Sequence, residues 1–333
     1  MHKIVVTGGA GFIGSHVAER IVAEYPDCTL AILDKMTYAA DLDNIAHILE
    51  RGKRQLYVGD LCDLEFCAEV TQDANLVVHL AAESHVDKAF GNSLRFTKSN
   101  TLGTHTLLEA CRINQVGKFI HVSTDEVYGE IYKGMHVESD PLDPTNPYSA
   151  SKAAADMIVK GYIRSFNMPI VTVRANNIYG IRQYPEKLIP RFILMGLNGQ
   201  KLPLHGDGRN RRRFLAVEDF ADALILMADK GLVGNIYNIG SDEEYANIEV
   251  AEMIASRLCL PREDLFCFVE DRPFNDSRYA VDSTKIHALG WKPTRSLERH
   301  LGKIIDWYRE NKDRYGHICE PFPLGAVLVA REG

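Results

Sequence analysis

The segment KIVVTGGAGFIG (residues 3–14) joins an apolar run to a turn that contains three regularly spaced glycines. The run KIVV predicts a buried strand, and the apolar spacing of GFIGSHVAERIVAEY (residues 11–25) predicts a helix. Gly8, Gly11 and Gly14 lie between the two. Glycine lets the chain turn tightly, so that backbone N–H groups can approach a pyrophosphate at the positive end of a helix. The segment therefore predicts a dinucleotide-binding unit.

An acidic residue ends the next predicted strand. TLAILD finishes at Asp34, 20 residues after Gly14. A carboxylate at this position can accept from both ribose hydroxyls and would repel a 2′-phosphate, which favours NAD over NADP. Asp60 in VGDL can accept from the adenine edge, and HLAA (residues 79–82) supplies small side chains beside the cofactor. The alternative is a glycine-rich turn followed by a surface aspartate.

Strand-like and helix-like segments alternate through the first half of the chain and more loosely after about residue 180. Predicted strands cover residues 29–34, 75–82, 118–124 and 235–240, and predicted helices cover residues 101–114, 189–200, 217–231, 247–259 and 297–311. This alternation predicts parallel strands with helices on both faces. We expect an α/β fold, a Rossmann-type doubly wound parallel sheet with a smaller mixed α/β C-terminal lobe. Residues 1–180 would carry the NAD site and the catalytic residues. Residues 181–333 would mainly form the smaller lobe, which closes over a cleft, with segments that cross back to the sheet.

The composition excludes several classes of protein. With 333 residues and 46% hydrophobic content, the chain can bury a large core. Its net charge of −7 argues against a general nucleic-acid binder. No apolar run approaches the length of a membrane span, and the first residues form a predicted strand rather than a signal peptide. We therefore expect a soluble cytoplasmic protein with no nucleic-acid or membrane partner.

The cysteines show no metal-binding or disulfide pattern. The chain contains seven, none of them in a C-x-x-C pair: Cys28, Cys62, Cys67, Cys111, Cys259, Cys267 and Cys319. Because the number is odd and the spacing irregular, we expect reduced thiols packed as small hydrophobic side chains. No metal site is expected.

The segment YSASK places Tyr148 and Lys152 four residues apart, on one face of a predicted helix. A lysine one turn beyond a tyrosine can lower the pKa of the phenol and can hydrogen-bond a nicotinamide ribose. The tyrosine can then act as a base toward a substrate hydroxyl near neutral pH. Thr124, after an intervening strand, can hydrogen-bond the same hydroxyl. A surface pair on a helix is the alternative for Y-x-x-x-K alone. Combined with the glycine turn, the three residues predict hydride transfer at a secondary alcohol.

STDEVYG (residues 123–129) places Asp125 and Glu126 side by side where a hydrophobic strand ends. Buried carboxylates are costly unless they are solvated or used. A polar turn is one interpretation, and an acid–base pair is the other. Close carboxylates tend to titrate separately, so that one ionises easily and the other stays protonated.

These motifs resemble the extended short-chain dehydrogenase/reductase superfamily along nearly the whole chain. The resemblance rests on TGGAGFIGSH, LAAESHVD, NTLGTHTLLEA, STDEVYG, PTNPYSASKAAADM, YPEKLIPRFI and RPFNDSRYAVD. Within the superfamily the chain is similar to the nucleotide-diphosphate-glucose 4,6-dehydratases of the dTDP-glucose and UDP-glucose type. Epimerases and decarboxylases of the superfamily share the glycine turn and Y-x-x-x-K but generally lack the adjacent Asp-Glu pair.

The resemblance implies a role for each catalytic residue. Tyr148 would take the proton of the sugar 4-hydroxyl while hydride leaves C4 for NAD, with Thr124 and Lys152 in support. Glu126 would then remove the C5 proton, and Asp125 would protonate the departing 6-hydroxyl. Hydride would return to C6 and give the 4-keto-6-deoxy sugar.

The resemblance also implies that residues 181–333 mainly bind the nucleotide sugar, and it implies two sets of binding residues. The cofactor set is Gly8, Gly11, Phe12, Ile13, Gly14, Asp34, Lys35, Asp60, Leu61, Ala81, Ala82, Asn100, Tyr148 and Lys152. The substrate set is Ser84, His85, Asn177, Lys187, Leu188, Arg212 and Asn275, with Glu83 beside the sugar pocket. Within the basic run 209–213, one arginine would bind the diphosphate because its fork matches phosphate oxygens, and the others would form a solvated loop.

Several questions stay open at this stage. Bacterial dTDP-glucose enzymes of the family usually have Arg-Asp-Trp where this chain has Arg212-Arg213-Phe214, so either UDP or dTDP remains possible. Another NAD-dependent epimerase or decarboxylase is one alternative function, and a catalytically silent NAD-binding scaffold is a remoter one. The resemblance also implies a homodimer formed through the helix near residues 100–111 and the helix that carries Tyr148.

Overall fold

The computed structural model describes residues 1–50, 52–261, 265–271 and 274–318. Its strands are β1 (Lys3–Thr7), β2 (Thr29–Asp34), β3 (Arg54–Val58), β4 (Leu76–His79), β5 (Lys118–Thr124), β6 (Ile170–Ala175), β7 (Asn177–Tyr179), β8 (Leu202–His205), β9 (Arg211–Ala216), β10 (Ile236–Ile239), β11 (Glu244–Ala246) and β12 (Phe266–Val269). Cys319 and the end of the expected substrate lobe lie outside the described residues.

The α-helices are α1 (Phe12–Glu24), α2 (Ala46–Leu49), α3 (Leu64–Thr71), α4 (Val86–Gly91), α5 (Ser93–Phe96), α6 (Gly103–Ile113), α7 (Pro147–Phe166), α8 (Leu188–Leu197), α9 (Val217–Lys230), α10 (Asn247–Arg257), α11 (Thr284–His287) and α12 (Leu297–Glu310). Tighter or wider helical turns are η1 (Leu42–Asn44), the π-helical η2 (Thr97–Leu102), η3 (Asp125–Tyr128) and η4 (Lys312–Ile318).

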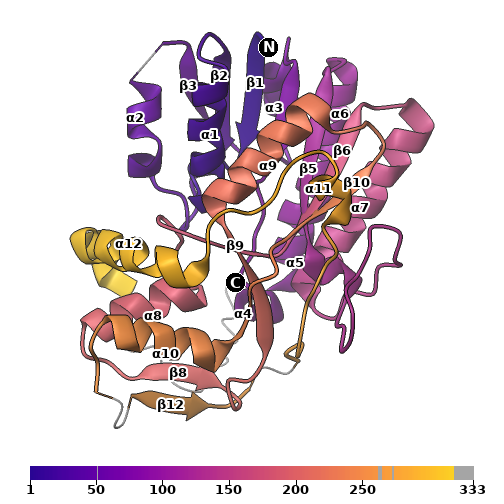
Figure 1. Ribbon diagram of the computed structural model, residues 1–333. Coiled ribbons are helices and arrows are strands. Elements are labelled where there is room, and N and C mark those ends of the chain that lie inside the picture. The colour runs from indigo at the N-terminus through magenta and orange to yellow at the C-terminus, as the bar shows by residue number, and fades with distance from the viewer. Residues whose placement is uncertain (51, 262–264, 272–273, 319–333) are drawn as a thin grey trace, which may run out of the picture.

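The large sheet has seven strands in the order β10-β6-β5-β4-β1-β2-β3 (Figure 1). All of its neighbouring strands run parallel. The chain first builds outward from β1 to β3, and then from β4 in the opposite direction, so the strand order reverses between β1 and β4. In such sheets ligands bind outside the carboxyl ends of the strands at this reversal. The predicted Rossmann-type doubly wound sheet is confirmed.

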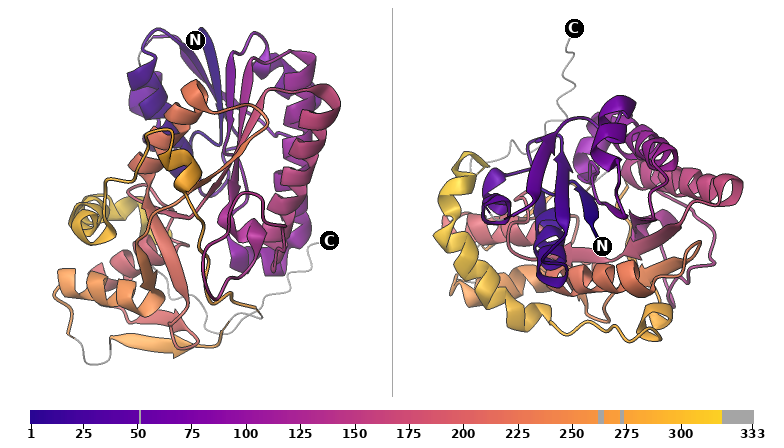
Figure 2. Two further views of the ribbon diagram at one scale, coloured as in Figure 1. Left: turned by 45° about the vertical axis from the view of Figure 1, so that its right-hand side comes forward. Right: turned by 90° about the horizontal axis from the view of Figure 1, so that it is seen from above.

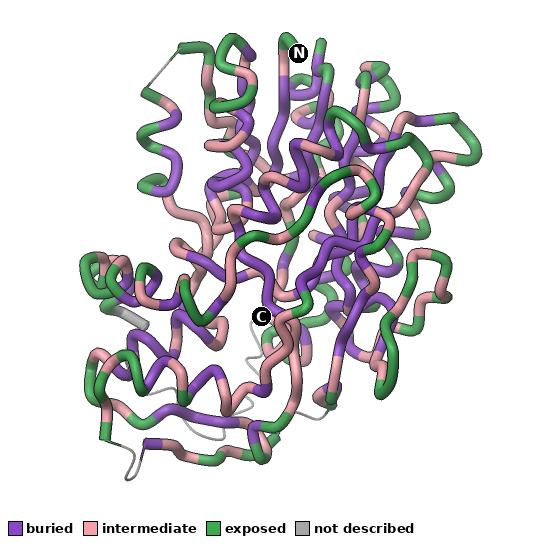
Figure 3. Tube along the Cα trace, viewed as in Figure 1, coloured by how far each residue is buried: buried purple, intermediate pink, exposed green. Residues whose placement is uncertain are grey.

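Helices cover both faces of this sheet because successive side chains of its strands point to opposite sides. Ile4 and Val6 belong to one buried cluster together with Val17 of α1 and Phe220 of α9. Val5 belongs to the cluster on the other face, with side chains of α3, α6 and α7. Figure 2 shows the two helical layers on either side of the strands, and Figure 3 shows how continuously the strands are buried. A fully buried aliphatic side chain contributes about 1.5–3 kcal/mol, so these layers fix the strand ends that build the site.

A smaller lobe lies beyond the carboxyl ends of the strands. Helices α8, α10 and α12 share a separate buried cluster with β8. The parallel pair β12–β8 and the three-stranded sheet β11-β9-β7 complete this lobe. The chain then returns to the large sheet, since α9 packs on α1 and β10 pairs with β6.

Two further properties concern the described residues as a whole. In this part of the chain, no helix has both the length and the apolar character needed to cross a membrane. Nor do the same residues gather three or more His, Cys, Asp or Glu side chains into an arrangement that could hold a metal ion.

Candidate active site

A pocket of about 410 Å³ lies at the carboxyl ends of the strands, between the large sheet and the smaller lobe. Most of the predicted site residues line it: Gly8, Gly11, Phe12, Ile13, Gly14, Asp34, Lys35, Asp60, Leu61, Ala81, Ala82, Glu83, Ser84, Thr124, Glu126, Tyr148, Lys152, Asn177, Lys187 and Leu188. Five predicted residues lie outside this lining: His85, Asn100, Asp125, Arg212 and Asn275.

The glycine turn is held close to the end of β4 and to Asp34. Gly8 has a φ of +69°, and a Cβ at this position would lie 2.8 Å from the Cα of Ala81, so only glycine fits. Asp34 is buried, and its two oxygens accept from the backbone N–H of Ala10 at 3.0 Å and of Met36 at 2.9 Å. Burial raises the pKa of Asp34. Asp34 therefore anchors the turn as well as facing the pocket.

Asp60 lies on the same side of the pocket and is already partnered. One of its oxygens is 2.6 Å from the Nζ of Lys35, and the other accepts from the backbone N–H of Cys62 at 3.0 Å. The two predicted cofactor residues Lys35 and Asp60 thus form an ion pair at the rim. Each carboxylate oxygen keeps a lone pair that can accept a further hydrogen bond.

The start of α7 positions Tyr148. Asn146 caps the helix by accepting from the backbone N–H of Ser149 at 2.9 Å, and Pro147 occupies the first helical position. The hydroxyl of Tyr148 is hydrogen-bonded to Thr124. Burial raises the pKa of Tyr148, and the charge of Glu126 raises it further. The hydrogen bond with Thr124 acts in the opposite direction, but the pKa of Tyr148 is raised rather than lowered as expected.

Lys152 is buried one turn after Tyr148, and its ammonium donates to the carbonyl oxygen of Val122 at 2.8 Å. Burial lowers the pKa of Lys152 to about 8, while the charge of Asp156 acts in the opposite direction. The ammonium is thus held beside the end of β5, on the helical face that it shares with the tyrosine.

The adjacent carboxylates have different surroundings. η3 begins directly after β5, and the Thr124 hydroxyl caps it by accepting from the N–H of Glu126 at 3.3 Å. Asp125 is 2% exposed, and burial followed by the charge of Glu126 raises its pKa to about 7. Burial also raises the pKa of Glu126, but the positive charges of Arg212 and Lys187 lower it. The pKa of both carboxyls is therefore raised, and Asp125, with a pKa of about 7, can hold a proton near neutral pH.

Asn100 braces the pocket from behind. It lies in the π-helical turn η2, and its side-chain oxygen accepts from the N–H of Glu83 at 2.8 Å. Its NH₂ group donates to the carbonyl oxygen of Glu83 and to the hydroxyl of Ser151, each at 2.9 Å. Since this uses both ends of the amide, Asn100 connects the sugar side of the pocket to α7.

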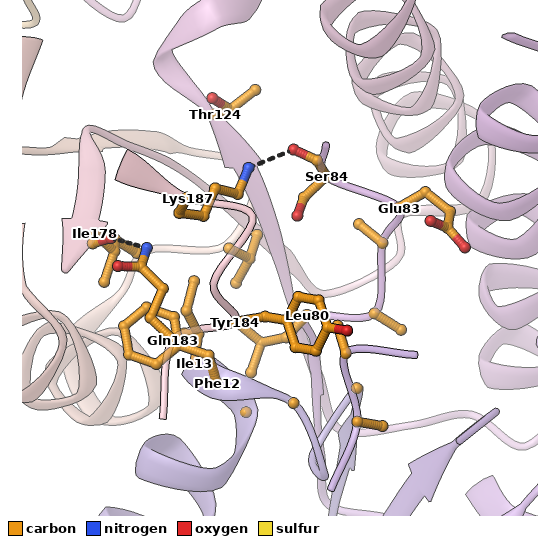
Figure 4. A pocket seen from close by; sticks show the side chains of 18 of the residues that line it. Phe12, Ile13, Leu80, Glu83, Ser84, Thr124, Ile178, Gln183, Tyr184 and Lys187 are labelled. Atoms are coloured by element: carbon orange, nitrogen blue, oxygen red, sulfur yellow. Dashed lines mark hydrogen bonds between the residues drawn. The ribbon is translucent and has the colours of Figure 1, made fainter. Parts of the chain in front are cut away.

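The residues expected around the sugar lie on two segments that face each other. Lys187 donates to the carbonyl oxygen of Ser84 at 2.6 Å, as Figure 4 shows. Glu83 accepts two hydrogen bonds from Arg95. His85 caps α4, and burial, followed by the charge of Lys187, lowers its pKa to about 4. His85 is therefore neutral at physiological pH.

Within the basic run, the charge of Arg212 acts on the carboxylate pair and lowers the pKa of both Asp125 and Glu126. Arg212 lies 4.7 Å over the ring of Tyr279, and its Nη2 is 3.4 Å from the side-chain oxygen of Asn275. Arg211 and Arg213 instead form ion pairs with Glu244. These two are therefore structural rather than a solvated loop, whereas Arg209 is exposed.

Asn176 lines the pocket but was not among the predicted site residues. It follows β6 directly, and its NH₂ group donates to Asp125 at 2.8 Å. The segment RANN carries two successive asparagines near the end of a strand, and the predicted substrate set contains only the second, Asn177. Because residues that follow a parallel strand lie at the edge where ligands bind, the position of both asparagines indicates a site residue.

The sequence model of the GDP-mannose 4,6 dehydratase family matches residues 5–304. The chain belongs to this family. The resemblance that the motifs indicate is thereby confirmed, since relatives named dTDP-glucose and UDP-glucose 4,6-dehydratase also match.

Three relatives of this family member illustrate the match. A trifunctional UDP-glucose 4,6-dehydratase/3,5-epimerase/reductase of Arabidopsis thaliana is 45% identical over 98% of this chain and 49% of its own length. The human dTDP-D-glucose 4,6-dehydratase is 40% identical over 97% of this chain and 95% of its own. The crystal structure of a dTDP-glucose 4,6-dehydratase from Streptomyces venezuelae, with NAD and a second ligand bound, shares 39% identity and a TM-score of 0.91 over 94% of this chain and 98% of that one.

The plant relatives are longer than this chain. The chain spans about half of the length of the trifunctional proteins of Arabidopsis thaliana that it matches.

Proposed function

We propose that the chain is an NAD-dependent hydro-lyase that converts dTDP-glucose or UDP-glucose to the corresponding 4-keto-6-deoxyglucose nucleotide. One observation carries the proposal: Glu126 lines one pocket together with Thr124, Tyr148 and Lys152, and Asp125, just outside this lining, accepts from the Thr124 hydroxyl at 3.2 Å. Oxidation of the sugar at C4 uses Thr124, Tyr148 and Lys152. Elimination of water needs an additional acid and base, which the adjacent carboxylates supply.

The glycine turn fits a dinucleotide. A Cβ at Gly14 would lie 2.0 Å from the carbonyl oxygen of Gly8, so the first turn of α1 lies against the backbone of the loop. The N–H groups of Phe12 and Ile13 would then face a pyrophosphate, and Asp34 would accept from the ribose. Hydride transfer away from C4 and back to C6 is the chemistry that bound NAD would supply. Solved dehydratases with NAD bound support the same cofactor here.

The first proton transfer belongs to Tyr148. Its oxygen, as the phenolate, takes the proton of the sugar 4-hydroxyl, and Thr124 hydrogen-bonds the sugar oxygen on which negative charge develops. The ammonium of Lys152, fixed on Val122, adds a positive charge one helical turn away. The negative carboxylates nearby oppose the phenolate, so this cation is needed to favour it.

The second pair of proton transfers belongs to the carboxylates. Glu126 removes the C5 proton, which the 4-keto group has made acidic, and Asp125 protonates the 6-hydroxyl as the C6–O bond breaks. Glu126 later returns its proton to C5. The proton that Tyr148 took from the 4-hydroxyl then replaces the one that Asp125 gave up, so that in net terms this proton and the hydroxyl lost from C6 make up the water released. The cycle therefore needs no external acid, base or oxidant.

Product analysis with UDP-glucose and dTDP-glucose side by side tests the proposal. The expected result is a 4-keto-6-deoxy product that absorbs in strong alkali, without added NAD. A galactose product would establish the epimerase alternative instead. An absence of turnover with both sugars, despite bound NAD, would establish a silent scaffold. The relative rates with the two sugars decide the nucleotide, which the relatives leave open because they are named for both.

We also propose a homodimer in the cytoplasm. Four large apolar side chains are exposed on η2, α6 and α7, where the interface is expected: Leu102, Ile113, Met157 and Phe166. The reducing compartment is supported by the cysteines, since six of them are free thiols among the described residues.

A further inference from the structure

Asn176 and Asp125 occupy equivalent positions at the ends of two neighbouring strands. Thr124, the last residue of β5, is in register with Ala175, the last residue of β6. The residues that follow each strand are therefore neighbours across the sheet. The Nδ2 of Asn176 donates to the Oδ2 of Asp125 at 2.8 Å, and both side chains are buried.

The orientation of the Asn176 amide is fixed from its other side. Its Oδ1 lies 3.2 Å from the backbone nitrogen of Ser241, which can only donate. A Cβ at Gly240 would lie 2.1 Å from the same oxygen, so the turn after β10 packs directly on the amide. The oxygen must therefore face the turn, and the NH₂ group must face Asp125.

This orientation decides which oxygen of Asp125 can carry a proton. The Oδ2 receives an N–H group and must offer it a lone pair, so a proton on that oxygen would meet another donor. The remaining oxygen, Oδ1, accepts from the hydroxyl of Thr124 at 3.2 Å. A hydroxyl can rotate, so the Thr124 oxygen can accept instead when Oδ1 carries the proton, whereas the NH₂ group of Asn176 can only donate. Thr124 lines the pocket and Asp125 does not, so a proton on Oδ1 lies on the side of Asp125 that contacts the pocket lining.

We infer that Asn176 is a positioning residue that places the acidic proton of Asp125 on Oδ1, directed at the 6-hydroxyl of the sugar. This inference rests on the proposed dehydratase function and concerns its elimination step. Asn176 acts through Asp125, so the expulsion of the C6 oxygen depends on it, whereas oxidation at C4 and proton removal from C5 do not.

The test compares two leaving groups. The probes are UDP-glucose or dTDP-glucose, whichever the wild-type protein converts, and the 6-deoxy-6-fluoro analogue of that sugar. Hydroxide is a much stronger base than fluoride, so loss of water needs a proton donor far more than loss of fluoride does. Both probes give the same 4-keto-6-deoxy product.

The variant Asn176→Asp keeps the size of the side chain and the acceptor for Ser241 but turns an oxygen toward Asp125. The proton of Asp125 is then drawn to Oδ2. We expect product formation from the natural sugar to fall about 100-fold, the scale of a general acid, and from the fluoro analogue by less than about tenfold. The rate of NAD reduction, which accompanies oxidation of the sugar at C4, should change little. Asn176→Ala removes the amide without adding a charge and should give the same dependence on the leaving group.

Two further variants calibrate the result. Asp125→Asn lacks the acid itself and should also be rescued by fluoride, whereas Glu126→Gln lacks the C5 base and should be equally slow with both probes. If both Asn176 variants lose the two activities equally, the residue is only structural and the inference is overturned. If the wild-type protein makes no 4-keto product from either natural sugar, the proposed function fails instead.

Discussion

The ammonium of Lys152 donates to the carbonyl oxygen of Val122 at 2.8 Å, so this lysine of α7 is attached to the strand that ends at Thr124. One helical turn further on, Asp156 is buried between two partners. Its oxygens lie 2.9 Å from the Nε2 of His121 and 2.9 Å from the Nε of Arg174. The buried carboxylate of Asp156 thus lies one helical turn beyond Lys152, whose ammonium it faces electrostatically.

Asp156→Asn should move the alkaline limit of catalysis to lower pH. The pKa of Lys152 is about 8, and the charge of Asp156 holds it up against burial. Without that charge the ammonium loses its proton at lower pH, and the support for Tyr148 is lost there. We expect the alkaline limb of the pH–rate profile for NAD reduction, measured in a single turnover, to shift down by about one pH unit.

A control separates this electrostatic effect from loss of stability. Arg174→Lys disturbs the buried pair but keeps the carboxylate, so the variant should be less stable while its alkaline limb stays in place. Asp156→Asn should also be destabilised, by about 3–5 kcal/mol, because it leaves Arg174 buried without a charged partner. An unchanged limb in Asp156→Asn would restrict Asp156 to a structural role.

Asp125→Asn should stabilise the protein above neutral pH. The pKa of Asp125 is raised from 3.8 to about 7 in the folded state, so its favourable contribution is present at low pH and is lost as pH rises through 7. At pH 8 the wild-type protein must keep a charged carboxylate buried, and the amide avoids that cost. We expect the free energy of unfolding at pH 8 to rise by at least about 1 kcal/mol, with a smaller change at pH 5. Urea unfolding at both pH values measures it, and a difference independent of pH would contradict the burial argument.

The sequence predicts those parts of the site that depend on strand ends and helical periodicity. The glycine turn, Asp34, Thr124 and the Tyr148–Lys152 pair follow from local patterns, and the structure places all of them around one pocket. Parallel strands bring their carboxyl ends to one edge, so such residues meet wherever the register falls.

Contacts between distant segments could not be predicted in this way. Asp125 and Asn176 are 51 residues apart, and their contact depends on the register of β5 with β6. The pairing of Arg211 and Arg213 with Glu244 depends on the antiparallel register of β9 with β11. A basic run in the sequence gives no indication of which arginine remains directed at the site.

Asp34→Asn should weaken retention of NAD. The carboxylate accepts from two backbone N–H groups, of Ala10 and Met36, and an amide can accept from only one of them. The turn then loses an anchor, and repulsion of a 2′-phosphate is lost with the charge. We expect less NAD per chain in the purified protein and at least about tenfold weaker discrimination against NADP.

Asp63→Asn provides the matched control for this prediction. Asp63 caps α3 by accepting from Phe66, and asparagine caps equally well. Because this residue does not line the pocket, the NAD content of its variant should equal that of the wild-type protein. Equal NAD content and NADP discrimination in Asp34→Asn would show that the carboxylate does not contact the cofactor.

Met157→Glu should weaken the proposed homodimer. Met157 is 48% exposed on α7, one of the two helices through which the dimer is expected to form. In a two-fold symmetric interface each substitution occurs twice, so two carboxylates would replace apolar contacts. We expect dimer dissociation at least about tenfold more favourable, which is about 1.4 kcal/mol, by sedimentation equilibrium. Phe268→Glu is the control, because Phe268 is 60% exposed but lies on β12, in the two-stranded sheet of the smaller lobe. Equal effects of the two substitutions would contradict an interface on α6 and α7.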